Sequence, residues 1–147
     1  MQNQISNICR CSFLELRRIS SIRSFLSRDA CEKFVNGLIT SRLDYCNSVL
    51  CGLPSEQIER LQRVQNNAAR LILRKRKHDH VTPLLKELHW LPVKFYIQYK
   101  VATLAYRRFD GTLPSYLSDS LCVYQPLRSL RSSGEKFLKC PDETCNL

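Results

Sequence analysis

The chain has 147 residues, with 23 Lys and Arg against 13 Asp and Glu, and its formal net charge is +10. This length accommodates one domain, or one domain with an irregular tail, and excludes two full catalytic domains. Hydrophobic residues make up 44% of the chain, enough to build a core, so we do not expect global disorder. The basic excess favours attraction to polyanions and carries no information about the fold.

Two helices are predicted in the first third of the chain. Over residues 5–26, apolar and small side chains recur at steps of three and four, which is the spacing of one helix face: Ile5, Ile8, Ser12, Leu16 and Ile19. Ser27 is a predicted N-cap for a second helix, and Asp29 lies in its first turn, where the helix dipole favours a carboxylate. This second helix is predicted to continue to about Leu50, because Gly52 and Pro54 follow.

The third predicted helix, over residues 55–76, has the clearest two-sided pattern. On a wheel of about 100° per residue, its apolar side chains fall within an arc of about 140°. Five basic residues fall within a separate arc of about 100°: Arg60, Arg63, Arg70, Arg74 and Lys77. The sequence therefore predicts a basic stripe along one face of this helix.

Shorter helices are predicted in the second half of the chain. After a polar loop at residues 77–81, Thr82 and Pro83 form a start signal for a short helix that ends near Trp90. Pro92 opens a helix that Asp110 and Gly111 close, and Pro114 begins a last short turn.

No stretch alternates long enough to indicate a sheet. We therefore expect an all-α fold: an irregular bundle of about five or six helices. A single helical domain is expected over residues 1–125, and an irregular tail over residues 126–147.

The basic stripe is the sharpest functional feature that the residues alone provide. Guanidinium groups repeated along one helix face can follow the phosphate oxygens of nucleic acid without reading its sequence. The alternative interpretation is the solvated outer face of an amphipathic helix. Replacing the stripe should weaken nucleic-acid binding more than replacing five other basic residues if the stripe is a contact surface, and equally if it is only a solvated face. The five comparison residues are Arg10, Arg17, Arg18, Lys136 and Lys139.

The helix after Pro92 carries apolar side chains on two sides. Aromatic residues dominate one of them, which comprises Phe95, Tyr99, Ala102 and Tyr106. Such rings can stack on bases, but a helix that is apolar on two sides is usually packed between others. We therefore expect these aromatic residues, and Trp90, to lie in the core.

The cysteines and histidines do not indicate a metal or cofactor site. None of the eight cysteines forms a Cys-x-x-Cys pair, and His78 and His80 have no third ligand at a suitable spacing. The first residues lack the order of a secretory signal, so we expect an intracellular protein, nuclear or cytoplasmic, with reduced thiols and no membrane association. The run from Arg74 to Lys77 is also compatible with a nuclear-import patch.

Five runs of residues, taken together and in order, resemble a known family. They are TSRLDYCNSVLCGLP at 40–54, LQRVQNNAARLI at 61–72, HVTPLLKELHWLPV at 80–93, LPSYLSD at 113–119 and RSLRSS at 128–133. The chain resembles the C-terminal region of open reading frame 2 proteins from LINE-type (non-LTR) retrotransposons, closest to jockey-related lineages, over roughly residues 5–133. The resemblance implies that residues 5–75 correspond to the thumb of a reverse transcriptase and its connection.

The chain departs from this family where the polymerase chemistry resides. The family's aromatic-x-Asp-Asp motif binds two magnesium ions, and this sequence contains no Asp-Asp pair. No catalytic residue is therefore transferred from the resemblance, and no cofactor is expected.

The resemblance implies a non-catalytic fragment of an RNA-directed DNA polymerase. Its expected partner is a duplex or RNA–DNA hybrid, gripped at the backbone through the basic stripe. The alternative is a helical protein–protein interaction fragment that packs on an absent polymerase palm or self-associates.

Overall fold

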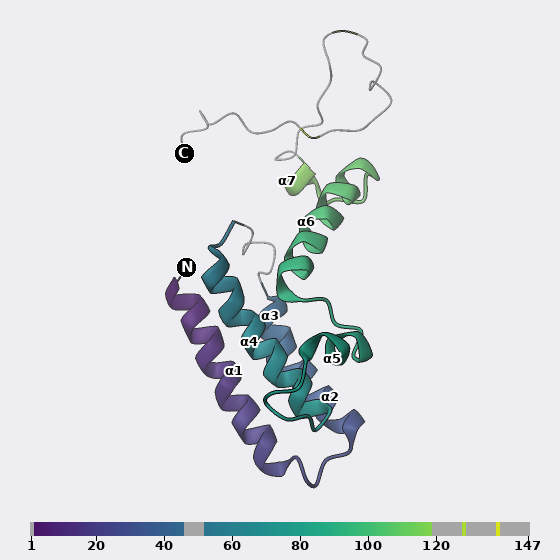
Figure 1. Cartoon of the computed structure of the whole chain (residues 1–147). Helices are drawn as coiled ribbons and strands as arrows, with labels where there is room; N and C mark the ends of the chain where they lie inside the picture. Colours follow the sequence, from purple (N-terminus) through teal and green to yellow (C-terminus); the bar gives the residue numbers. More distant parts are fainter. Residues whose placement is uncertain (1, 46–51, 119–127, 129–137, 139–147) are drawn as a thin grey trace. The chain divides into compact units, whose positions relative to one another are not determined.

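The computed structural model describes residues 2–45 and 52–118 together with residues 128 and 138. The helices, in chain order, are α1 (Gln2–Ile22), α2 (Arg28–Val35), η1 (Asn36–Thr40), α3 (Ser41–Asp44), α4 (Ser55–Ile72), α5 (Val81–Glu87), α6 (Val93–Phe109) and α7 (Ser115–Ser118) (Figure 1). The described residues contain no strand, and the all-α prediction is confirmed. Because α2, η1 and α3 are continuous, these elements make six helical segments, within the predicted number.

The chain divides into two compact units, Met1–Tyr99 and Lys100–Leu147. The first unit contains α1 to α5 and the beginning of α6. The predicted domain boundary at residues 125 and 126, and nearly all of the predicted tail, lie outside the described residues. Both therefore remain predictions.

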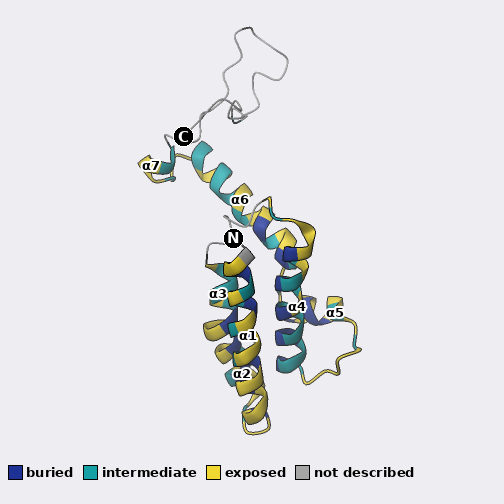
Figure 2. Ribbon diagram, turned by 90° about the vertical axis from the view of Figure 1, so that its left-hand side faces the viewer, coloured by how far each residue is buried: buried dark blue, intermediate teal, exposed yellow. Residues whose placement is uncertain are grey.

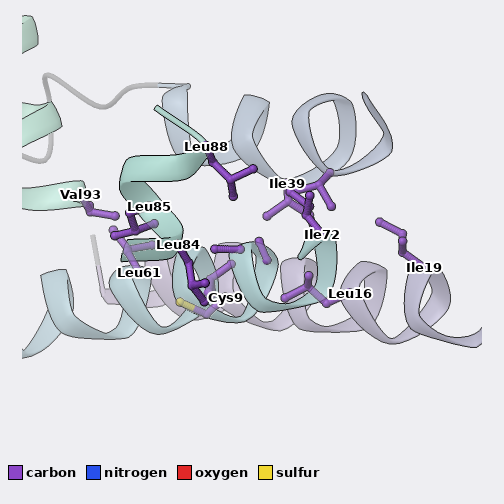
Figure 3. Packing of buried hydrophobic residues seen from close by; sticks show 14 of the residues in the cluster. Cys9, Leu16, Ile19, Ile39, Leu61, Ile72, Leu84, Leu85, Leu88 and Val93 are labelled. Carbon is purple, nitrogen blue, oxygen red and sulfur yellow. The ribbon is translucent and has the colours of Figure 1, made fainter. Parts of the chain in front are cut away.

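Helices α1 and α4 are parallel neighbours, and their packing forms the centre of the first unit. Near their starts, the Arg60 guanidinium donates to the Ser6 hydroxyl; near their ends, Arg23 donates to the carbonyls of Leu71 and Ile72. Each helix buries one side, as the three- and four-residue steps predict, and Figure 2 shows this along α1. Figure 3 shows the buried hydrophobic cluster, in which side chains of α1 and α4 pack together with residues of η1, of α5 and of the start of α6.

The segment from Arg28 to Asp44 packs against α1 and α4 and contains a π-helical turn. Its start follows the prediction, because the Ser27 hydroxyl accepts a hydrogen bond from the Ala30 amide at 3.2 Å. The π turn at Asn36–Thr40 was not predicted, and it changes the register of the helix between buried Val35 and buried Ile39. The predicted continuation to Leu50 lies outside the described residues after Tyr45.

Helix α4 ends at Ile72, four residues before the predicted end, so this boundary of the prediction is wrong. Arg74 adopts a left-handed conformation with φ of 51°, and the Lys75 amide donates to the Arg70 carbonyl at 2.9 Å. This is the hydrogen-bond pattern of a Schellman motif, which usually requires glycine at the left-handed position. A sequence pattern that expects glycine there does not detect a helix end formed by arginine.

Helix α5 packs against α4, and the connection to α6 is tied to the same helix. The Val93 amide donates to the Gln62 side chain at 2.8 Å, and the Gln65 side chain donates to the Leu91 carbonyl at 2.9 Å. Helix α5 begins at Val81, without a side-chain cap from His80, so the predicted cap at Thr82 is misplaced. Helix α6 begins directly after Pro92, as predicted.

The aromatic side of α6 is not in the core, which corrects the prediction. Buried Val93 and Ile97 attach the start of the helix to the first unit, whereas Phe95, Tyr99 and Tyr106 are exposed. Trp90 is partly buried against the core, in line with the prediction. In the second unit, Gly111 has φ of 72° and the Thr112 amide bonds to the Arg107 carbonyl, which closes α6 at the predicted residues.

Candidate nucleic-acid interface

The five predicted contact residues do not form one continuous stripe. Arg60, Arg63 and Arg70 lie on α4, whereas Arg74 and Lys77 follow the end of the helix. Arg63, Arg74 and Lys77 are exposed, and Arg60 and Arg70 are partly buried. The prediction of a single basic helix face is therefore wrong for its last two members, because the chain turns at Arg74.

Arg60 connects α4 to α1. Its guanidinium donates to the Ser6 hydroxyl at 3.2 Å and to the Gln57 side-chain oxygen at 3.3 Å. Burial raises the pKa of the nearby Cys9 thiol, and the positive charge of Arg60 opposes that rise. Arg60 thus contributes to the packing between the two helices, and only part of its hydrogen-bonding capacity is left for a ligand.

Arg70 shapes the loop that follows α4. Its terminal nitrogen donates to the Asp79 carbonyl at 3.2 Å, while its Nε is buried without a hydrogen-bond partner. The Asp79 carboxylate accepts from the Arg76 amide at 2.7 Å, so the basic segment is folded back on itself. Substitution of Arg70 therefore changes the loop as well as the charge.

Arg23 is a structural residue that sequence reasoning missed. It is only 8% exposed, and its guanidinium donates to three carbonyls, those of Leu26, Leu71 and Ile72. Two of these are C-terminal carbonyls of α4, which have no partner within the helix. Arg74 donates in return to the Arg23 carbonyl at 3.2 Å. The only sequence signal was a basic residue at the end of an amphipathic pattern.

A groove runs between α1 and α4, and we call it the α1–α4 groove. Its volume is about 620 Å³, and it is lined by Phe13, Leu16, Arg17, Ser20, Ser21, Asn67 and Leu71. On α4, exposed Arg63 is one turn before Asn67 and on the same side. On α1, exposed Arg10 is seven residues before Arg17 and on the same side.

The groove changes which of the five basic residues outside the predicted stripe can serve as controls for binding. Arg17, which the sequence placed apart from the basic stripe, lies across the groove from the α4 residues. Arg18 lies on another side of α1 and pairs with Glu15 at 3.0 Å. Lys136 and Lys139 are outside the described residues. Of these five residues, only Arg18 is therefore a suitable control for the basic residues at the groove.

No cofactor or metal site emerges from the part of the chain that the structure describes. No group of three or more His, Cys, Asp and Glu residues is close enough to hold a metal ion there, and Cys9, Cys11 and Cys31 are free. The five other cysteines lie outside these residues. No described helix is long and apolar enough to cross a membrane.

A second cavity, of about 240 Å³, lies between η1, α3, α4 and the start of α6. Ile39, Ala68 and Trp90 contribute apolar lining, and the Tyr96 hydroxyl donates to the Asp44 carboxylate at 2.9 Å. Cavities that bind small molecules usually measure about 300–1,000 Å³. This cavity is below that range.

Comparisons of the chain with protein-family models, with curated proteins and with solved structures find no match.

Proposed function

We propose that the chain is a non-catalytic nucleic-acid-binding segment related to the thumb and post-thumb region of LINE-type reverse transcriptases. Its role is to grip the backbone of a template–primer duplex inside the cell, in the nucleus or the cytoplasm. The resemblance of five ordered sequence runs suggests the family, and the charge of +10 favours a polyanionic partner.

The observation that carries the proposal is a contrast between two groups of cations. Arg18, Arg28 and Lys33 each pair with a carboxylate at 2.8–3.0 Å. Within the described residues, Arg63, Arg74 and Lys77 are exposed and have no such ion pair. Cations without carboxylate partners are available to phosphate oxygens, and each phosphate contact releases counterions from the nucleic acid.

The test uses the two predicted contacts whose side chains have no structural hydrogen bonds. Arg63→Gln and Lys77→Gln are combined in one variant, and Arg18→Gln and Lys33→Gln in a control that loses the same charge. Binding to a 16-base-pair RNA–DNA hybrid is measured by fluorescence anisotropy over a range of salt concentrations. Each lost contact should flatten the plot of log affinity against log salt by about 0.7–0.9, so the first variant should flatten it by roughly 1.4–1.8.

The control variant should keep the slope of the unmodified protein, because its cations already pair within the chain. Equal flattening in both variants means that bulk charge, rather than these residues, governs binding. Absence of salt-dependent binding in the unmodified protein overturns the proposed function.

A protein–protein interaction fragment is the second candidate, and exposed apolar side chains favour it. Phe25, Phe34 and Leu38 are exposed near and along the segment that begins at Arg28. Large exposed apolar areas often mark interaction sites. Sedimentation at increasing protein concentration tests for self-association, which Phe34→Ser and Leu38→Ser together should abolish if this face mediates it.

A further inference from the structure

We propose that the α1–α4 groove binds an unpaired strand of nucleic acid, with the strand's backbone between Arg17 and Arg63 and a base stacked on Phe13. The inference rests on the proposed function and adds three elements to it. These are a second helix, a specific groove and a contact with an unpaired strand.

The charge of the groove fits a phosphate backbone. Exposed Arg17 of α1 lines the groove, exposed Arg63 lies one helical turn before the lining residue Asn67 on α4, and no carboxylate is among the described residues that line it. Glu15, the acidic residue of α1, is occupied by Arg18. On α4, exposed Glu59 is one helical turn before Arg63 and on the same side, and it is about 12 Å along the helix axis from Asn67. A negatively charged chain in this groove therefore meets Arg17 with no carboxylate among the described lining residues, and it meets Arg63 one turn beyond Asn67.

Phe13 gives the groove a surface on which a base can stack. Phe13 is 42% exposed, and the groove that it lines also contains the polar or charged side chains of Arg17, Ser20 and Asn67 beside those of Leu16 and Leu71. A cationic groove with an exposed aromatic ring is the usual combination in proteins that bind single strands. The polar side chains beside the ring can also donate to phosphate or sugar oxygens.

The aromatic contact favours an unpaired strand over a duplex. In a duplex, the faces of each base are covered by the neighbouring base pairs, so Phe13 has no base face to contact. In a single strand the faces are accessible, and stacking on an aromatic side chain tolerates any base. Backbone contacts and stacking are common to DNA and RNA, so the groove should bind single strands of both.

Two adjacent residues of α1 allow a matched test of the aromatic contact. Phe13 and Leu14 are 42% and 46% exposed, but only Phe13 lines the groove. Binding of fluorescein-labelled 12-nucleotide DNA and RNA strands, and of a 12-base-pair duplex, is measured by anisotropy. Phe13→Ala should weaken binding of both single strands at least about fivefold and change duplex binding less than twofold. Leu14→Ala should change all three less than twofold.

The arginine contact is tested with the next matched pair. Arg17→Gln should flatten the salt dependence of single-strand binding by about 0.7, whereas Arg18→Gln should leave it unchanged. Circular dichroism confirms that each variant keeps its helices. If nucleic acid binds with the expected salt dependence but Phe13→Ala equals Leu14→Ala, or Arg17→Gln equals Arg18→Gln, the groove is not the binding site while the proposed function stands. If no nucleic acid binds, both fail.

Discussion

Single arginine residues serve different purposes in this chain, and their surroundings determine which. Arg23 is buried and donates to three carbonyls, so its planar group of donors is used almost entirely inside the protein. Exposed Arg17 lines the α1–α4 groove, whose described lining contains no carboxylate, and exposed Arg63 lies one helical turn before Asn67 of that lining. A stability role therefore belongs to the first, and a binding role is proposed for the other two.

Substitution of Arg23 tests the structural assignment. Arg23→Ala leaves two C-terminal carbonyls of α4 without their charged donor, and it should lower the free energy of unfolding by about 3 kcal/mol. Arg18→Ala removes an ion pair whose arginine is largely exposed, and it should cost less than about 1 kcal/mol. Urea denaturation measures both, and similar losses in the two variants contradict the capping role.

Two buried thiols should make the protein less stable at alkaline pH. Burial raises the pKa of Cys9 and of Cys31 above their ordinary value, near 9, although Arg60 opposes the rise at Cys9, and Arg23 and Arg74 oppose it at Cys31. The unfolded chain therefore loses these protons first, so the stability they contribute is complete below pH 9 and declines as the pH rises further. Urea denaturation between pH 8 and 10 should show this decline.

The cysteine prediction has an internal control and an independent measurement. Hydrogen bonding to Asp29 raises the pKa of Lys33 above 10.5. The stability that Lys33 contributes is therefore lost only above this pH, so a decline in stability between pH 9 and 10 is assigned to the two thiols. Replacing both Cys9 and Cys31 by Ala should flatten the decline in this window. In the native protein, iodoacetamide should modify the partly exposed Cys11 before either buried thiol. A decline of equal slope in the double variant contradicts the assignment.

At the level of the elements, the ends of the helices determine where the basic residues lie. Helices α4 and α5 both end with a left-handed residue other than glycine, Arg74 with φ of 51° and His89 with φ of 55°. In α5, the Trp90 amide donates to the Leu85 carbonyl at 2.8 Å, the same pattern as in α4. The turn at Arg74 ends α4, so Arg74 and Lys77 lie beyond the helix.

His89→Gly should stabilise the protein, because glycine adopts the left-handed conformation without the steric cost of a side chain. That cost is about 1–2 kcal/mol, and the larger entropy of glycine in the unfolded chain offsets part of it, so we expect a net gain of about 0.5–1 kcal/mol. Lys86→Gly, in the last turn of α5, where the residue is helical, should instead cost up to about 1 kcal/mol. Thermal unfolding measures both, and a loss at His89→Gly contradicts the prediction.

The sequence predicted the elements better than their ends. Periodic apolar residues gave all-α architecture, and Ser27 and Pro92 located the starts of α2 and α6. The end of α4 was missed because a left-handed arginine has no sequence signal, and the π turn was missed because a shift of one residue hardly changes the apolar pattern. The aromatic residues of α6 were assigned to the core because periodicity reports which residues share a face, and does not report whether a partner covers it.

The sequence predicted only the α4 part of the candidate site, because a pattern within one helix does not show which other helix lies beside it. Exposed Arg63 lies where the wheel placed it, but Arg60 packs toward α1, and Arg17 comes from that other helix. A helical wheel describes one element at a time. The pairing of α1 with α4 depends on long-range packing, so the groove between them becomes visible only in the folded chain.

At the level of the whole molecule, the hydrophobic core belongs to the first unit. Among the described residues, every buried apolar side chain lies between Ile5 and Ile97. Helices α1 to α5 contribute most of these buried side chains, and Val93 and Ile97 of α6 contribute the last two. The stability of the protein should therefore depend on residues 1–99, and the start of α6 should be needed for it.

Truncation tests this distribution of stability. A chain ending at Tyr99 keeps all of the buried apolar residues described here, so it should unfold cooperatively with a urea midpoint close to that of the full chain. A chain ending at Leu91 loses Val93 and Ile97, which should cost roughly 3–6 kcal/mol at about 1.5–3 kcal/mol for each buried side chain. Val93→Ala and Ile97→Ala together in the full chain provide the control, because they remove the same contacts without shortening the protein. If the chain ending at Tyr99 is unfolded while this double variant is stable, the residues beyond Tyr99 contribute to the core, and the division of stability proposed here is wrong.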